Sequence, residues 1–413
     1  MNRYLKGALL AGLLSSSLDT FAFQTDSVDI KNALRVFNEV KVKYAPDKRT
    51  EVANVQISGA SPLTVAIETT KPALVADVKA ALMQASISAV VTADTLPAKA
   101  LNGKLYAIAN LSVCNNRVMP GNAAEMVTQI LLGTPVMVLK KQSGYYLVRS
   151  PDNYISWVDG GGLTLMDKTE FEAWQKTPKV IYTAQYGHAF DQPSDKGLPV
   201  SDLVAGDILQ VAGKEKGFLK VIYPDQRVGY IKKDEAADFT KWLAIPNPDA
   251  DKILTTAKTL IGVPYLWGGT SIKGVDCSGF TKSCYFLNGV IIPRDASQQA
   301  LVGDSVDIYE GNTDSISIDK CLKNLQPGDL LFFSSGMKQG KLAKITHTAI
   351  YMGDGQFIQS AGMVKINSLK QDAPNFDQYR LDRLVKARRM LNSIGKPEII
   401  KVSNHSFYTE NTL

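Results

Sequence analysis

Apolar and polar residues alternate with different periods along the chain, and one segment has the period of a helix. Its apolar side chains lie three or four residues apart, at Phe280, Cys284 and Leu287. The pattern predicts a helix that begins after Asp276, with Cys277 in its first turn. Unsatisfied backbone N–H groups and the positive end of the helix dipole favour a thiolate there, so Cys277 is a candidate nucleophile. The alternative, a small buried apolar residue, is the more common role of such a cysteine.

Two later apolar runs, 347–352 and 356–361, read as strands on either side of a Gly-Asp-Gly turn. If the loop consists of the three residues 353–355, His347 and Gln359 lie on the same face of the hairpin. Gln359 could then orient the imidazole. A two-residue loop would send the two side chains to opposite faces, so this pairing depends on the loop length.

The chain has three histidines, and a cysteine nucleophile needs one of them as a base. His347 begins an apolar strand, although a single histidine at a strand start usually has a structural role. His188, in a loop of the second predicted barrel described below, and His405, in the tail, have no nucleophile nearby in the sequence. Both are interpreted as surface residues.

An internal repeat precedes the region of Cys277. Residues 133–138 match 206–211 at an offset of 73. The two copies occupy 103–165 and 180–236, and each has short alternating strands with glycine turns, which predicts two small β-barrels. The segment 166–179 between them is charged and is predicted to be helical.

The remaining segments carry no recognisable chemistry. Residues 23–100 mix a helical pattern with strand-like alternation and are interpreted as a small α/β accessory domain. The tail, 391–413, is mostly polar and has no clear period, so we expect a mobile or loosely docked extension.

The first 22 residues have the three regions of a secretory signal peptide. Arg3 and Lys6 are followed by an apolar run, 7–14, that is too short to span a bilayer, and small residues lead up to Ala22. We expect cleavage after Ala22 and export to a periplasm or out of the cell, with no integral membrane segment.

Composition agrees with several packed domains, because the 413 residues are 45% hydrophobic. The net charge of +6 without a dense basic run does not indicate nucleic-acid binding. The four cysteines show no metal-ligand spacing. We therefore expect no metal, no cofactor and no disulfide that involves Cys277, and a monomeric chain.

Four ordered motifs carry a resemblance to a known family. They are Tyr265-x-Trp267-Gly268-Gly269, Asp276-Cys277-Ser278-Gly279-Phe280, Pro327-Gly328-Asp329-Leu330 and His347-x-x-Ile350-Tyr351. Over residues 248–390 the chain resembles the NlpC-type cell-wall cysteine peptidases, and the two barrels resemble bacterial SH3-like domains. The resemblance implies an α+β multidomain protein in which a papain-like peptidase domain is preceded by two SH3-like β-barrels and the N-terminal α/β domain.

The resemblance also implies catalytic roles. Cys277 is the nucleophile, His347 the base, and the hydroxyl of Tyr265 lies beside the oxyanion. The third position, which orients the base, is usually histidine in this family, whereas this chain has Gln359. A neutral amide stabilises an imidazolium less than a carboxylate would, so the expected role of Gln359 is orientation.

Further residues are expected to bind the substrate. Trp267 and the pair Asp276 and Ser278 lie within the motifs; Asp276 either caps the helix or reaches a substrate amine. Arg294 and Asp295 match a family segment beside the cleft and are also expected to contact the substrate. Arg294 is expected to hold the α-carboxylate of a γ-linked D-glutamate, or else to pair with Asp295 or another local acid. Alanine follows this Arg-Asp pair where the family often has serine.

Two residues of the first barrel complete this set. In similar peptidases an acidic residue and a tyrosine of the first barrel approach the free amino end of a stem peptide. Glu125 and Tyr154 match them loosely, and a solvated surface charge is an equal alternative for Glu125.

The sequence thus predicts an exported cysteine peptidase that cleaves murein stem peptides between γ-D-glutamate and an L-diamino acid through a thioester on Cys277. Two other hypotheses remain. One is a wall-binding protein whose peptidase domain is impaired by Gln359, and the other is an amidase or acyltransferase that acts outside murein.

Overall fold

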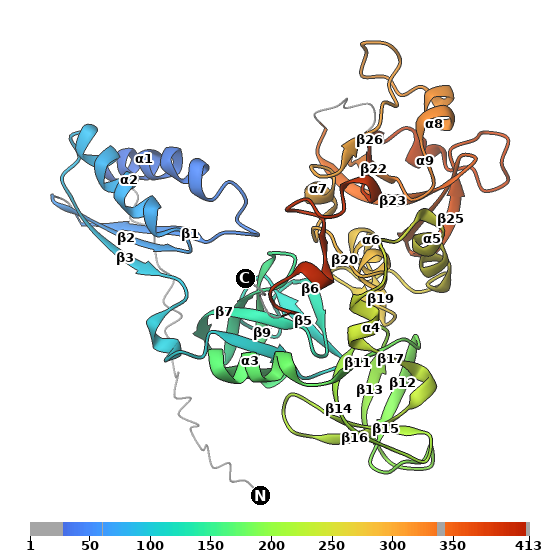
Figure 1. Ribbon diagram of the computed structural model, residues 1–413. Helices are drawn as coiled ribbons and strands as arrows, with labels where there is room; N and C mark the ends of the chain where they lie inside the picture. The colour runs from blue at the N-terminus through green and yellow to red at the C-terminus, as the bar shows by residue number, and fades with distance from the viewer. Residues whose placement is uncertain (1–27, 60, 337–342, 410–413) are drawn as a thin grey trace, which may run out of the picture.

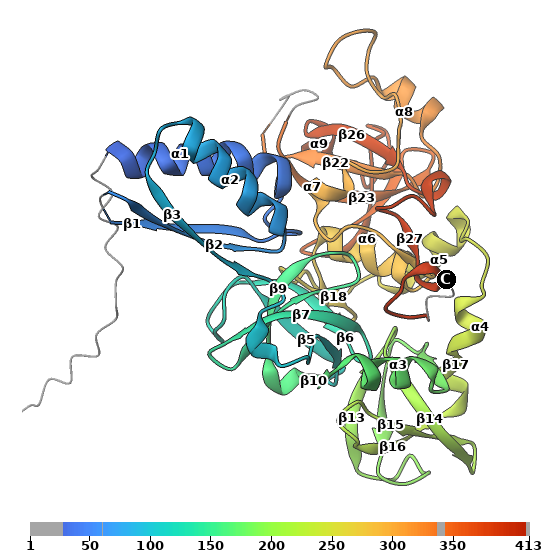
Figure 2. The same cartoon turned by 60° about the vertical axis from the view of Figure 1, so that its left-hand side comes forward.

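The computed structural model describes residues 28–59, 61–336 and 343–409. The predicted signal peptide, 1–22, lies outside these residues. The described part of the chain comprises an N-terminal α/β unit, two β-sheet units and a larger α+β unit (Figures 1 and 2). No helix within it is long and apolar enough to cross a membrane.

The N-terminal unit packs two helices on one face of a three-stranded sheet (Figure 1). Its elements are α1 (Val28–Tyr44), β1 (Ala53–Ser58), β2 (Leu63–Thr69), α2 (Pro72–Gln84) and β3 (Ala89–Thr95). The helical period of α2 buries Leu74, Val78 and Leu82 against the sheet. The segment thus contains both helices and strands.

The repeat in the sequence corresponds to a repeat of topology. The first unit has the strands β4 (Tyr106–Ala109), β5 (Val113–Arg117), β6 (Met126–Leu131), β7 (Pro135–Gln142), β8 (Tyr145–Arg149), β9 (Ile155–Asp159) and β10 (Leu163–Met166). The second has β11 (Lys179–Tyr182), β12 (Tyr186–Phe190), β13 (Pro199–Val204), β14 (Ile208–Glu215), β15 (Phe218–Ile222), β16 (Val228–Lys232) and β17 (Ala236–Asp238).

Both units form seven-stranded sheets with one strand order, β6-β5-β9-β8-β7-β4-β10 in the first and β13-β12-β16-β15-β14-β11-β17 in the second. The predicted helix between them is α3 (Lys168–Lys176), which Asp167 and Glu170 start with a capping box. His188 lies half-buried on β12, not in a loop as expected, and its ring packs against Tyr186.

The α+β unit is built on an antiparallel sheet of order β21-β26-β22-β23-β24-β25. Its helices are α5 (Ala250–Thr259), α6 (Cys277–Phe286), α7 (Ala296–Gln299), α8 (Ile318–Asn324) and α9 (Gln378–Leu381), and the short helix α4 (Phe239–Leu243) precedes it and packs against β11 and β17. Its strands are β18 (Thr270–Ser271), β19 (Gly274–Val275), β20 (Val290–Ile291), β21 (Asp304–Ser305), β22 (Leu330–Ser334), β23 (Ile345–Gly353), β24 (Gln356–Ala361), β25 (Met363–Ser368), β26 (Leu384–Arg389) and β27 (Ile400–Lys401).

Helix α6 is the central helix of this unit. Its apolar side, Phe280, Cys284 and Tyr285, is fully buried in one core with Ile350 of β23 and Ile358 of β24. The same helix lies beside the first seven-stranded unit in both views (Figures 1 and 2). The start of α6 is therefore held between the sheet and the first barrel.

The tail does not form the loosely docked extension that we expected. Strand β27 pairs with β20, and Tyr408 is buried in a core with Phe239 and Ile291. His405 is half-buried and contacts the Pro151 carbonyl oxygen through Nε2 at 3.0 Å. The tail is composed of very short elements that fill gaps between units, so its buried residues follow no helix or strand period.

Candidate active site

Cys277 is the first residue of α6, as predicted. Asp276 caps the helix: its Oδ1 accepts the Gly279 N–H at 2.6 Å, and its Oδ2 accepts the Gly268 N–H at 2.9 Å. Glycine is required at 279, because a Cβ there would lie 2.0 Å from the Gly269 carbonyl oxygen. This close approach places the cysteine against the loop that carries the first motif.

The hairpin that carries the base differs from the expected one in its loop. Only Asp354 and Gly355 connect the strands, because Gly353 pairs with Gln356. A bulge between Tyr351 and Gly353 shifts the strand pairing by one residue. Ile350 therefore lies opposite Ile358, as it would if the loop had three residues. The expected loop length was wrong, but the bulge returns the base and its partner to one face.

His347 and Gln359 are consequently hydrogen-bonded, with Nε2 of the imidazole 2.7 Å from Oε1 of the amide. The amide is itself oriented, because its Nε2 donates to Asn367 Oδ1 at 2.9 Å and lies 3.4 Å from Asp377 Oδ2. Gln359 therefore presents its carbonyl oxygen, which accepts a hydrogen bond from the Nε2–H and leaves Nδ1 with the free electron pair. No motif in the sequence pointed to Asn367 or Asp377.

Cys277 and the strand of His347 come together where α6 packs beside β23. The backbone N–H of Thr348, the residue after His347, is hydrogen-bonded to the Cys277 sulfur. Tyr265 lies in the same place: burial and the negative charges at Cys277 and Asp276 raise the pKa of its hydroxyl. The Cys277 thiol thus lies near Tyr265 and near the backbone that follows His347.

The resting thiolate that we expected is not supported. Burial, followed by the Asp276 charge, raises the pKa of Cys277 to about 11 and outweighs the helix N-terminus. Burial, followed by the Arg380 charge, lowers the pKa of His347 to about 3. At neutral pH the pair therefore rests as a neutral thiol and a neutral imidazole, with the proton still on sulfur.

Arg294 is not positioned as a free anchor for a substrate. Its side chain is 1% exposed and pairs with Asp276 at 2.7 Å and 3.1 Å, and it also donates to Ser278 Oγ at 3.0 Å and to Thr128 Oγ1 of the first barrel at 2.8 Å. Of the two roles considered, the structure has the ion pair with a local acid. Asp276 is occupied by this pair and by the helix cap, and Ser278 donates to it at 3.2 Å.

With this geometry established, comparison with known proteins identifies the family. The NlpC/P60 family profile matches residues 262–388, and the profile of the bacterial dipeptidyl-peptidase Sh3 domain matches 117–163. The chain is 30% identical over 247 residues to the gamma-D-glutamyl-L-lysine dipeptidyl-peptidase of Bacillus cereus, an alignment that covers 58% of this chain and 68% of that relative. The chain belongs to the NlpC/P60 family.

Two further likenesses agree with this assignment. Dipeptidyl-peptidase 6 of Lysinibacillus sphaericus is 27% identical over 295 residues, which are 66% of this chain and 95% of that protein. A solved NlpC/P60 family protein from Bacillus cereus is 25% identical, with a TM-score of 0.56, and covers 69% of this chain and 99% of its own. The chain is a cysteine peptidase with an NlpC/P60 domain and an SH3-like domain, as the sequence motifs predicted.

The SH3-like domain reaches the rim of the NlpC/P60 site at two points. Glu125 Oε1 accepts the indole N–H of Trp267 at 2.8 Å, and Trp267 is 59% exposed. Tyr154 is buried, with its hydroxyl 3.4 Å from Asp295 Oδ2. Each expected substrate residue of the barrel thus contacts an expected substrate residue of the NlpC/P60 domain.

A third unit also contributes to this rim. Arg49, from the segment between α1 and β1, donates to Asp295 Oδ2 and to Ser297 Oγ, both at 2.8 Å. Nothing in the sequence indicated that the N-terminal unit reaches the NlpC/P60 domain. The charge of Asp295 is therefore shared between Arg49 and the hydroxyl of Tyr154.

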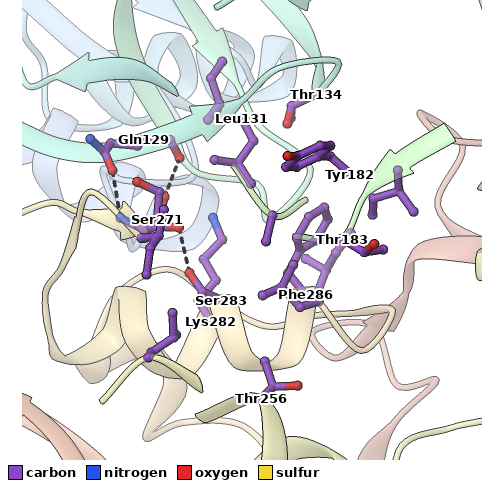
Figure 3. A pocket seen from close by; sticks show the side chains of 18 of the residues that line it. Gln129, Leu131, Thr134, Tyr182, Thr183, Thr256, Ser271, Lys282, Ser283 and Phe286 are labelled. Carbon is purple, nitrogen blue, oxygen red and sulfur yellow. Dashed lines mark hydrogen bonds between the residues drawn. The ribbon is translucent and has the colours of Figure 1, made fainter. Parts of the chain in front are cut away.

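A cavity of about 300 Å³ lies on another side of α6 (Figure 3). Both seven-stranded units and the NlpC/P60 domain line it, and α6 contributes Lys282, Ser283 and Phe286. Lys282 forms an ion pair with Asp152, and Ser283 donates to the Thr270 carbonyl at 2.8 Å. Because Cys277 does not line it, this cavity is separate from the catalytic site.

Within the described residues no three His, Cys, Asp or Glu side chains gather to hold a metal ion. The groups gathered around Cys277 and His347 are a thiol, an imidazole, a phenol and backbone N–H donors. These are the groups that acyl transfer through a thioester needs.

Proposed function

We propose that this protein hydrolyses the bond between γ-D-glutamate and an L-diamino acid in murein stem peptides, with Cys277 as nucleophile and His347 as base. The observation that carries the proposal is the contact of the Cys277 sulfur with the backbone next to His347, together with the 2.7 Å bond that orients this imidazole on Gln359. The names of the Bacillus cereus and Bacillus subtilis relatives, both gamma-D-glutamyl-L-lysine dipeptidyl-peptidases, support this bond as the one cleaved.

In the first half of the reaction the proton moves from Cys277 Sγ to Nδ1 of His347 while sulfur attacks the carbonyl carbon of the γ-glutamyl amide. Because Cys277 and His347 are both neutral before the reaction, the proton leaves the sulfur as the sulfur attacks. The backbone N–H groups at the start of α6 and the Tyr265 hydroxyl are the available donors to the oxyanion. His347 then gives the proton to the leaving amine, and a thioester on Cys277 remains.

In the second half His347 takes a proton from a water molecule, which attacks the thioester carbon. The carbon–sulfur bond breaks, the γ-glutamyl carboxylate is released, and the sulfur regains its proton. Gln359 keeps Nδ1 as the reacting nitrogen in both halves, because its carbonyl oxygen holds the proton on Nε2.

The SH3-like domain is proposed to bind the amino end of the acyl portion. Glu125 lies beside the exposed Trp267, and Tyr154 lies beside Asp295. Carboxylates and a phenolic oxygen suit an ammonium group, so a free amino end would be held where the barrel meets the domain. Such a site would favour trimmed stem peptides over polymeric wall.

We further propose that the second seven-stranded unit is also SH3-like, because its strand order is that of the first. Export through the predicted signal peptide, action as a monomer and an accessory role of the N-terminal unit complete the proposal. Export is supported by the pattern of the first 22 residues.

Defined stem peptides test the reaction. Purified protein is incubated with L-Ala-γ-D-Glu-L-Lys and with the meso-diaminopimelate analogue, and products are followed by mass spectrometry. Release of the free diamino acid, abolished by Cys277→Ala and retained by Cys284→Ala in the same helix, supports the proposal. Binding to intact murein without any product would instead favour the wall-binding hypothesis.

A further inference from the structure

Arg380 lies on α9, whose start is capped by Asp377 through the Arg380 N–H at 3.0 Å. Its guanidinium lies over the Phe333 ring at 5.6 Å and over the Tyr379 ring at 5.3 Å. Phe333 pairs with His347 across β22 and β23, and the two rings are 5.6 Å apart. One aromatic ring thus separates this guanidinium from the catalytic imidazole.

The guanidinium of Arg380 differs from those of the other arginines in the described residues. Each of the others donates from its side chain to a protein oxygen, namely Arg35, Arg49, Arg117, Arg149, Arg227, Arg294, Arg383, Arg388 and Arg389. Within the described ranges, the guanidinium of Arg380 lies against two aromatic rings and near the charge of Asp377, and it forms no hydrogen bond or ion pair with a protein oxygen. A half-buried guanidinium normally takes an anion, because its five N–H donors need acceptors.

The electrostatic interactions of this guanidinium also link it to the groups at Cys277, His347 and Tyr265. Burial lowers the pKa of Arg380, and the negative charges at Asp377, at Tyr379 and, after these, at Cys277 act in the opposite direction. The positive charge of Arg380 helps to lower the pKa of His347 and opposes the rise in the pKa of Tyr265. The guanidinium is therefore close enough to act on all three groups of the reaction centre.

The side of the site on which Arg380 lies indicates which part of a substrate it meets. Both views place α6 between the first seven-stranded unit and α9 (Figures 1 and 2). Asp377, the cap of α9, also reaches Gln359 at 3.4 Å, so α9 belongs to the side of the imidazole. His347 protonates the leaving amine, and the leaving residue must therefore lie on that side.

We propose that Arg380 is the specificity-determining residue for the leaving diamino acid, and that its guanidinium binds a carboxylate of that residue. The proposal rests on the function proposed above. The carboxylate is either the α-carboxylate at the end of a tripeptide or the side-chain carboxylate of a diaminopimelate, and both fit a two-pronged guanidinium contact. Arg294 cannot take this role, since its guanidinium is buried on Asp276.

Three substrates separate the two carboxylates: L-Ala-γ-D-Glu-L-Lys, the same peptide with a C-terminal amide, and the meso-diaminopimelate peptide. If the α-carboxylate is bound, amidation should lower the wild-type kcat/KM by about 10- to 100-fold, the range of a charge-assisted hydrogen bond. If the side-chain carboxylate is bound, the diaminopimelate peptide should be preferred over the lysine peptide by a similar factor. In Arg380→Gln the preference should fall to about twofold or less.

Arg383→Gln is the matched control. Arg383 lies three residues after Arg380, carries the same charge, and its guanidinium lies over the same Tyr379 ring. Arg380→Lys should restore part of the preference, and a thermal melt of each variant checks that the domain is folded. Preferences that survive in Arg380→Gln, or that disappear equally in Arg383→Gln, would overturn the inference. A wild-type enzyme that cleaves none of the three peptides would instead reject the proposed function.

Discussion

Replacing Arg294 by Gln tests whether this buried guanidinium is structural. The substitution leaves the Asp276 carboxylate, whose side chain is 9% exposed, without its partner and removes the bond to Thr128 of the first barrel. Loss of one member of a buried ion pair costs about 3–5 kcal/mol of unfolding free energy. For a domain of this size that cost corresponds to a fall in the melting temperature on the order of 10 °C.

Calorimetry of the full chain measures this fall, with Arg35→Gln as the control. Arg35 also pairs with a carboxylate at 2.8 Å, but both side chains are more than 60% exposed, so its loss should cost less than about 1 kcal/mol. The double variant Arg294→Gln, Asp276→Asn should recover part of the loss, because no unpaired charge remains. A melting temperature of Arg294→Gln within about 2 °C of wild type, with a raised KM for carboxylate-bearing peptides, would refute this reasoning.

Three other predictions concern the reaction centre and its rim. Gln359→Ala should lower kcat far less than His347→Ala, because only the imidazole moves the proton; equal losses would contradict an orienting role. Iodoacetamide should modify Cys277 slowly at pH 7 and about tenfold faster per pH unit up to about pH 11, measured against Cys277→Ala; a fast rate that does not change between pH 5 and 8 would show a resting thiolate. Glu125→Ala should reduce the preference for free-amine tripeptides over amino-acylated ones, and an unchanged ratio of kcat/KM values would remove Glu125 from the amine site.

The elements that carry the proposed catalytic residues were predictable because their signals are local. A capping aspartate followed by a helical period fixes Cys277 at the start of α6. The repeat at an offset of 73 predicted the two seven-stranded units, because each copy retains its glycine turns and strand alternation. The side-chain pair of the hairpin was also correct, although the sequence does not show whether a short loop is compensated by a bulge.

Features that depend on contacts between distant segments could not be read from the sequence. The pKa of Cys277 follows from how completely the cysteine is buried, which no local pattern shows. Arg294 precedes Asp295 in the chain but forms its ion pair with Asp276. Asp295 instead accepts a hydrogen bond from Arg49, which lies 246 residues earlier in the sequence. Arg380 lies in no recognisable motif. What distinguishes it is that, within the described residues, its guanidinium has no oxygen partner, and a sequence does not show this.

The most direct test of the central claim is to trap the acyl-enzyme. L-Ala-γ-D-Glu-L-Lys is mixed with the protein, the reaction is quenched in acid, and the peptide that contains Cys277 is analysed by mass spectrometry. The account predicts an L-Ala-γ-D-Glu adduct in thioester linkage on Cys277, together with free lysine, and a loss of both in His347→Ala. Free lysine that still forms in Cys277→Ala, or an adduct on another residue, would contradict it.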